Sequence, residues 1–258
     1  MKSVLKFSTP LEAWEGLNRS FLLHEDLNFK TGNGASYVYD LVLKIKQGGE
    51  IPEDFDFGKH FDYYITKWNT LCTDYLDMES LNEAKSEWEF ERSKESKKQK
   101  NVINIPIYFA HRHKNSKRCL LAGVISKRVR SNTNTLTIFL RASEVTKRLM
   151  VDLVLFARIG EYIFSNKNFE LVVHFNQIFN DDTVLLMYHT YESIFDILRD
   201  SNTERSKNIK EELKKLLEVD PKGVKYKVYK RILRVLRPGI YKEKAPTSTP
   251  ASLFQLKK

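Results

Sequence analysis

The sequence has few cysteines and no long apolar run. Cys72 and Cys119 are the only cysteines, and neither has a second pair nearby, so neither a disulfide framework nor a zinc site is indicated and no metal is expected. No stretch approaches the 18 consecutive apolar residues of a membrane helix, and the first residues lack the apolar run of a secretory signal. We therefore expect a cytoplasmic protein that does not enter the membrane.

The net positive charge of the chain lies entirely in its last part. Residues 204–258 carry 16 Lys and Arg against 6 Asp and Glu, which accounts for the whole net charge of +10. We expect residues 1–203 to form the core, in which the dense charge run at about 83–100 forms an exposed helix or a mobile excursion, and residues 204–258 to form a basic helical segment packed on the same domain. Such a segment can bind nucleic acid, bind an anionic substrate or simply be solvated surface.

Apolar periodicity predicts a mixed order of helices and strands. A helix begins at Ser8 or Thr9 as N-cap with Pro10 in its first position, and a second helix runs from about Val145 to Phe164. Period-two alternation predicts strands at 36–47, 102–112, 119–129, 136–142 and 169–179, and helical spacing predicts helices at 57–77, 182–200, 204–218 and 225–237. Because the two kinds of element do not alternate regularly, we expect a single-domain α+β fold with a mixed sheet packed with helices.

Residues 119–152 contain a thiol, a guanidinium and two carboxyl groups at the ends of predicted elements. Cys119 opens an apolar strand, Arg141 ends the next, Glu144 follows three residues later and Asp152 lies within an apolar helix. Cys119 could equally be a buried structural cysteine, and Arg141 could simply face solvent. Asp152 must be paired, exposed or functional because unpaired burial of a carboxylate is costly, and a salt bridge to Arg148 would explain it without function.

This arrangement resembles the thymidylate synthase superfamily, which includes the deoxycytidylate hydroxymethylases. The resemblance implies that Cys119 is the nucleophile that adds to C6 of a pyrimidine, so that C5 can attack a one-carbon unit of methylene-tetrahydrofolate. It implies that Arg141 binds the nucleotide phosphate, with Glu144 at the family's acidic position. Asp152 takes the place of the base-reading residue, where aspartate implies cytosine.

Upstream residues carry weaker parts of the same resemblance. The segment "FKTGNGASYVYD" resembles the family's phosphate loop with Lys30 in the arginine's place, and Lys98 and Lys100 lie about where a partner subunit supplies phosphate-binding arginines. A homodimer that binds a pyrimidine nucleotide is therefore implied, of a kind that suits a phage-encoded enzyme.

Several family positions differ in this chain. The catalytic glutamate of the family's first active-site helix has no counterpart, and Ala142 replaces a serine, although Ser143 follows. These departures favour an alternative in which the fold is catalytically inactive and has been reused as a nucleic-acid-binding or protein-assembly module.

Overall fold

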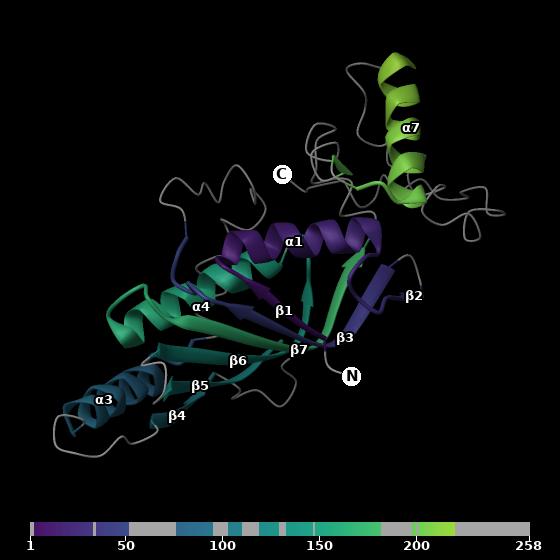
Figure 1. Ribbon diagram of the computed structural model, residues 1–258. Helices are drawn as coiled ribbons and strands as arrows, with labels where there is room; N and C mark the ends of the chain where they lie inside the picture. The colour runs from purple at the N-terminus through teal and green to yellow at the C-terminus, as the bar shows by residue number, and fades with distance from the viewer. Residues whose placement is uncertain are drawn as a thin grey trace, which may run out of the picture. The chain divides into compact units, whose positions relative to one another are not determined.

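The computed structural model describes residues 3–32, 35–51, 76–94, 103–109, 119–128, 133–146, 148–181, 198–199 and 201–219. The chain forms two compact units, Met1–Tyr188 and His189–Lys258. The second unit contains helix α7 (Glu204–Val219), as predicted. The first unit (Figure 1) contains, in chain order, β1 (Ser3–Phe7), α1 (Pro10–Leu23), β2 (Lys30–Gly32), β3 (Ala35–Ile45), α3 (Met78–Lys94), β4 (Ile103–Tyr108), β5 (Leu120–Arg128), β6 (Thr133–Glu144), α4 (Leu149–Phe164) and β7 (Glu170–Asp181).

The strands form one mixed seven-stranded sheet. Their order is β1-β3-β7-β6-β5-β4, with β2 paired to β3 beyond the end of β1. The neighbours β1 and β3, and likewise β6 and β7, are parallel, and the other pairs are antiparallel. The predicted α+β class with a mixed sheet is confirmed at this level.

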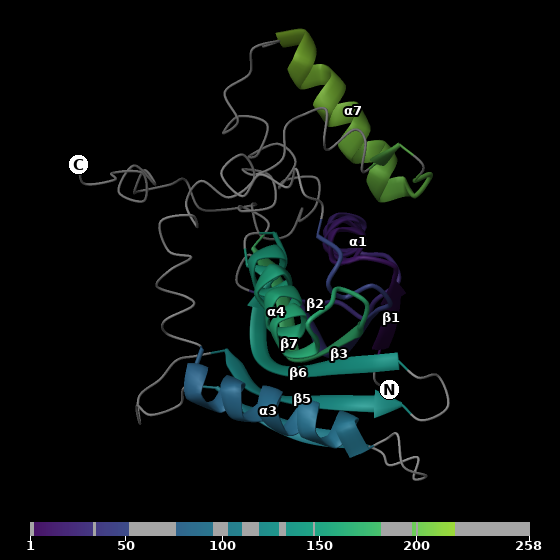
Figure 2. The same cartoon turned by 90° about the vertical axis from the view of Figure 1, so that its left-hand side faces the viewer.

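Handedness explains why α1 and α4 lie together. Each connects two adjacent parallel strands, and such crossovers are almost always right-handed. The parallel strands of the β1-α1-β3 unit run antiparallel to those of the β6-α4-β7 unit, and the two units cross the sheet towards each other in the strand order. Right-handed crossovers therefore place both helices on the same face of the sheet. Figures 1 and 2 show α1 beside α4, and Trp14 of α1 donates from Nε1 to the carbonyl of Val145 just before α4.

One hydrophobic core lies between this face and the helices, and we call this the inner face. Side chains of alternate strand residues, among them Leu43, Ile138 and Val173, pack against α1, α3 and α4. Helix α4 is apolar on nearly every side because α1 and α3 flank it while the sheet lies below. The inward residues predicted for this helix are all buried: Leu149, Leu153, Phe156, Ile159 and Ile163.

Helix α1 begins as predicted, whereas α4 begins later than predicted. Thr9 is the N-cap of α1, where its hydroxyl accepts from the backbone N–H of Glu12. Helix α4 begins at Leu149 rather than at Val145. The N–H of Val145 donates to the carbonyl of Phe179 in β7, and Glu144 accepts from the N–H of Thr146, so this turn is held to the sheet.

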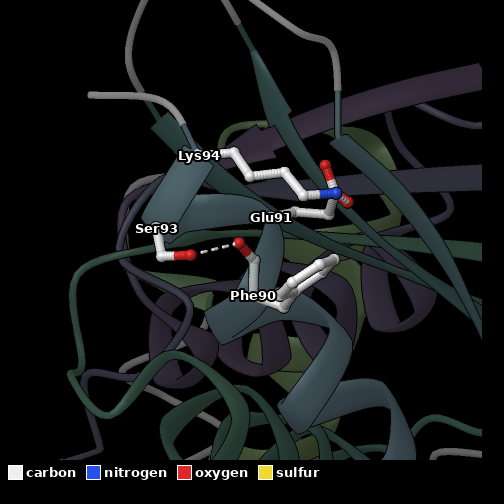
Figure 3. A network of polar contacts seen from close by, with 4 residues as sticks. All are labelled: Phe90, Glu91, Ser93 and Lys94. Atoms are coloured by element: carbon white, nitrogen blue, oxygen red, sulfur yellow. Dashed lines mark hydrogen bonds and ion pairs between the residues drawn. The ribbon is translucent and has the colours of Figure 1, made fainter. Parts of the chain in front are cut away.

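The first part of the charged segment at 83–100 is helical, which is one of the two forms expected for it. Residues up to Lys94 belong to helix α3, which buries Leu81, Ala84 and Trp88 at helical spacing. The charged residues of the helix are exposed or half-buried, and Figure 3 draws the ion pair of Lys94 with Glu91. The segment therefore contributes to the core, because a narrow apolar stripe suffices to hold a helix against a sheet edge.

Neighbouring strands depart from regular alternation at one level of the sheet. Along most of each strand, every second residue lies on the inner face. At one level the spacing is three residues instead of two: from Leu41 to Val38 in β3, from Phe175 to Ile178 in β7 and from Leu140 to Ser143 in β6. In β5 the register shifts between Leu120 and Ala122, and Asp40 in β3 has a positive φ of 53°. Extra outward residues bend strands, and Figure 2 shows β6 curving towards α4.

Several predicted features lie outside the described residues. They include the helix at 57–77 with Cys72, most of the helix at 182–200, and the helix at 225–237. In the part of the chain that is described, no helix is long and apolar enough to cross a membrane.

Candidate functional site

Cys119 and Arg141 adjoin on neighbouring strands. The backbone N–H of Arg141 donates to the carbonyl of Cys119, at an N–O distance of 2.7 Å. Cys119 is a free cysteine, partly buried against the core, whereas the side chain of Arg141 is exposed. The predicted hairpin thus brings the two residues together, just where β5 has its bulge.

Lys30 and Glu144 lie in one row across four strands. The strand registers pair Lys30 with Tyr37, Tyr37 with Phe179 and Phe179 with Glu144. Three strand spacings separate the ends of this row, or about 14 Å. The neighbouring residues Val38 and Ile178 belong to the core, so alternation places the row on the opposite, outer face of the sheet.

Two aromatic rings occupy the middle of this row. Tyr37 and Phe179 stack with their ring centroids 6.1 Å apart, and Lys30 holds its ammonium 5.2 Å from the ring of Tyr39. Arg141 lies on the same face by alternation, level with Asn176 of β7 and Asp40 of β3. This end of the outer face therefore combines cations with stacked aromatic surface.

Asp152 lies on the inner side of the sheet. Its Oδ2 accepts from the hydroxyl of Ser143 at 2.8 Å, and its Oδ1 accepts from Nε of Arg148 at 3.1 Å. Burial raises the pKa of the Asp152 carboxyl above its ordinary value of 3.8, although Arg148 and the Ser143 hydroxyl oppose this shift. The salt bridge between Arg148 and Asp152 that the sequence suggested is therefore present, and both carboxylate oxygens of Asp152 are hydrogen-bonded within the chain.

A second buried polar cluster lies beside Asp152. The hydroxyl of Thr146 is 3.1 Å from Oδ1 of Asn18 in α1 and 3.0 Å from Oδ1 of Asn180 in β7. A hydroxyl has one proton to donate, and Nδ2 of Asn180 is buried without a partner. Turning the Asn180 amide lets Nδ2 donate to Thr146 and satisfies both groups. The cluster then joins α1, the turn before α4 and β7, which is a structural role.

The structure thus sorts the predicted site residues into two groups. Cys119, Arg141, Lys30 and Glu144 lie at one end of the sheet, and Asp152 lies on the inner side of the sheet, in the first turn of α4. Lys98 and Lys100 lie outside the described residues. Within the described part of the chain, no group of three or more His, Cys, Asp or Glu side chains is arranged to hold a metal ion.

Sequence reasoning missed the aromatic pair of Tyr37 and Phe179 and the polar row of Asp40 and Asn176. Alternation alone gives the face of each residue within its strand, but Tyr37 and Phe179 are 142 positions apart in the chain. Only the pairing register shows that Tyr37 stands opposite Phe179. Neither the models of known protein families nor the curated protein sequences gave a match to this chain.

Proposed function

We propose that this protein binds a pyrimidine nucleotide at the end of the sheet where Cys119 and Arg141 adjoin. The observation that carries the proposal is the hydrogen bond between their backbones, because it holds a free thiol and an exposed guanidinium on neighbouring strands. An arginine fork suits a phosphate, and Lys30 adds a second cation at the same end. This pairing is also the one expected from the resemblance to thymidylate synthases.

In the enzymatic form of the proposal, the thiolate of Cys119 adds to C6 of a cytidylate. Addition at C6 makes C5 nucleophilic, and once C5 has bonded to a one-carbon unit at the oxidation level of formaldehyde, loss of the C5 proton expels the thiolate of Cys119 and restores the ring. Addition of water then gives a hydroxymethyl group, whereas a methyl group would need two further electrons from the folate. Methylene-tetrahydrofolate is the donor that the resemblance implies. Glu144 and Asp152, the acids at the family positions, accept hydrogen bonds within the chain. Because both acids are engaged within the chain, we assign neither of them a role towards a folate.

The hydrogen bonds of Asp152 favour a second candidate, a module without catalysis that binds a nucleotide or a nucleic acid or serves in protein assembly. A base reader needs lone pairs or protons available to the base edge. Both oxygens of Asp152 are instead occupied by Ser143 and Arg148. In this form, Arg141 and Lys30 hold the phosphate and no covalent bond forms.

Two measurements separate the candidates. Binding of deoxycytidylate, followed by calorimetry, should weaken by about tenfold or more in Arg141→Gln, because a charge-assisted phosphate contact is lost. Incubation with deoxycytidylate, formaldehyde and tetrahydrofolate should yield a C5-modified nucleotide with the native chain and none with Cys119→Ala. Binding without product supports the module, and unaltered binding in Arg141→Gln contradicts both candidates.

A further inference from the structure

Exposed aromatic side chains gather on the outer face of the sheet. The described helices of the first unit, α1, α3 and α4, all pack against the inner face. Tyr39, Tyr108 and Phe139 alternate with core residues of their strands and therefore lie on the outer face, with 37% to 65% of each residue exposed. A single exposed ring is ordinary, but several rings on one face mark a binding surface.

One row of residues crosses six strands in the middle of this face, and we call it the aromatic row. The registers align Tyr108, Ala122, Phe139, His174, Val42 and Val4, from β4 to β1. Phe139 and His174 stack with their ring centroids 4.9 Å apart, and the small Ala122 separates Phe139 from Tyr108. Five strand spacings give the row a length of about 24 Å. The row thus offers two separate platforms on which flat groups can stack.

Two lysines lie side by side next to the aromatic row. Lys6 of β1 and Lys44 of β3 are register partners, and core residues flank each of them in its strand, so both side chains lie on the outer face. Like charges directly opposite each other in a sheet are destabilising. Within the described residues, neither lysine side chain forms an ion pair or a hydrogen bond. An anion bound from outside the chain would therefore relieve their repulsion.

This combination of rings and cations selects the partner. An apolar protein surface would cover the rings but leave the lysines uncompensated, and a double helix keeps its bases stacked on one another. A single strand of nucleic acid supplies both unstacked bases and phosphates. Sheets with exposed aromatic residues bind two or three bases of a single strand in this way. Asp40 is exposed on the opposite side of the row from the lysines, so it keeps the phosphates on the lysine side.

We propose that the outer face binds single-stranded nucleic acid. The bases stack on Tyr108 and on the pair of Phe139 and His174. The phosphates bind to Lys6 and Lys44 at the other end of the row. A length of about 24 Å suits about four nucleotides, which is at the short end of known single-strand sites. Because ring faces accept every base, this site reads little sequence.

This inference gives the module candidate a site of its own. It needs neither Cys119 nor the pyrimidine nucleotide of the proposed function. It also differs from binding by the basic residues 204–258, because phosphates alone satisfy those residues. The outer face instead supplies the part of the affinity that requires bases.

The first test compares two oligonucleotides on the full-length chain. Fluorescence anisotropy at about 200 mM salt, which weakens purely ionic binding, measures an oligothymidylate of about 12 nucleotides and an abasic strand of equal length and charge. We expect the native chain to bind the oligothymidylate about tenfold or more tightly. Phe139→Ala and, separately, Tyr108→Ala should each reduce this ratio by about fivefold.

Phe90→Ala is the matched control for the rings. Phe90 is an exposed aromatic residue, but it lies on α3 beside Lys94, as Figure 3 shows, and α3 packs on the inner side of the sheet. Its removal should leave the ratio unchanged. Equal affinity of the native chain for the two strands, or a ratio that survives in both Phe139→Ala and Tyr108→Ala, overturns the proposal.

The second test replaces the lysine pair. Lys6→Gln combined with Lys44→Gln should weaken binding of both strands about equally, by about fivefold, and reduce the salt slope by about one, because two phosphate contacts are lost. The same change should not lower the free energy of unfolding, since it removes a repulsion. Lys85→Gln combined with Lys94→Gln on α3 is the matched control and should have no effect on binding. Unchanged affinity in the first pair overturns the phosphate assignment.

The same samples separate this inference from other uses of the face and from the proposed function. A native chain that is a dimer, becomes a monomer in Phe139→Lys and binds neither strand would assign the face to a second copy and overturn the proposal. Base-dependent binding of the oligothymidylate without binding of deoxycytidylate would leave this inference standing and reject the proposed function. Binding of deoxycytidylate with no preference for the base-containing strand would do the reverse.

Discussion

At the scale of single residues, neighbouring side chains decide what each chemical group can do. Asp152 and Arg141 are eleven positions apart, yet one is 6% exposed and bonded twice, and the other is exposed at a strand end. The salt bridge between Arg148 and Asp152 was predictable from the sequence, because the two residues are four positions apart in a helix. The hydrogen bond from the Ser143 hydroxyl to Asp152 was not predictable, because it depends on the bend of β6 that turns Ser143 towards α4.

Asp152 should make stability depend on pH. Its pKa is raised in the folded chain, so the stabilisation it contributes is complete below its unfolded value of about 3.8 and is lost as the pH rises through the folded value. Asp152→Asn removes this dependence. We therefore expect the free energy of unfolding of Asp152→Asn, relative to the native chain, to increase from pH 4 upwards and then level off. Urea denaturation at a series of pH values measures this difference, and a decrease with pH would contradict the assignment.

At the scale of elements, the packing of α4 against β7 depends on close approach. Gly160 faces the ring of Phe169, which is fully buried just before β7. A Cβ at Gly160 would overlap that ring, and the surrounding core leaves the ring little room to move. Helical periodicity identifies the inward side of α4 but does not reveal which strand residue lies against each turn.

Gly160→Ala should therefore destabilise the fold even though alanine favours helices. We expect a loss of about 1–3 kcal/mol or more, the usual cost of overpacking a core, measured by chemical denaturation. Gly32→Ala is the matched control, because no heavy atom lies within 4 Å of a Cβ placed there. Equal stability of the two variants would show that Phe169 can move aside.

At the scale of the whole molecule, charge is divided unevenly along the chain. Residues 1–203 carry 27 basic and 27 acidic side chains, whereas the remainder carries the entire net charge. Ten Lys and Arg and one Glu follow Lys222. A segment of this kind neutralises phosphates without reading sequence.

If the module candidate holds, most of the salt-dependent part of nucleic-acid binding should reside in that segment. We expect the affinity for a single-stranded oligonucleotide to fall steeply, by a factor of ten or more, between about 50 and 200 mM salt. A chain ending at Lys222 should lose most of this affinity while keeping its melting temperature. Fluorescence anisotropy measures the binding, and salt-independent or absent binding would remove the nucleic-acid version of the candidate.

The sequence by itself determined the elements whose signals are local. Period-two alternation of apolar residues predicted the strands β3 to β7, and helical spacing of apolar residues predicted α1 and α4. Thr9 and Pro10 predicted where α1 begins. The pairing of β1 and β2 with β3 was not predicted, because a short strand becomes one only by hydrogen bonding to a distant partner. The mixed-sheet class was therefore predictable, whereas its strand order was not.

Only the tertiary structure decided which residues share a site. It placed Cys119 beside Arg141, aligned Lys30 with Glu144, and set Asp152 on the other side of the sheet. It also gathered apolar residues of five strands on one outer face. The physical reason is that periodicity fixes a side chain's direction within its own element, while strand register and bulges, set by contacts far apart in the chain, fix its neighbours.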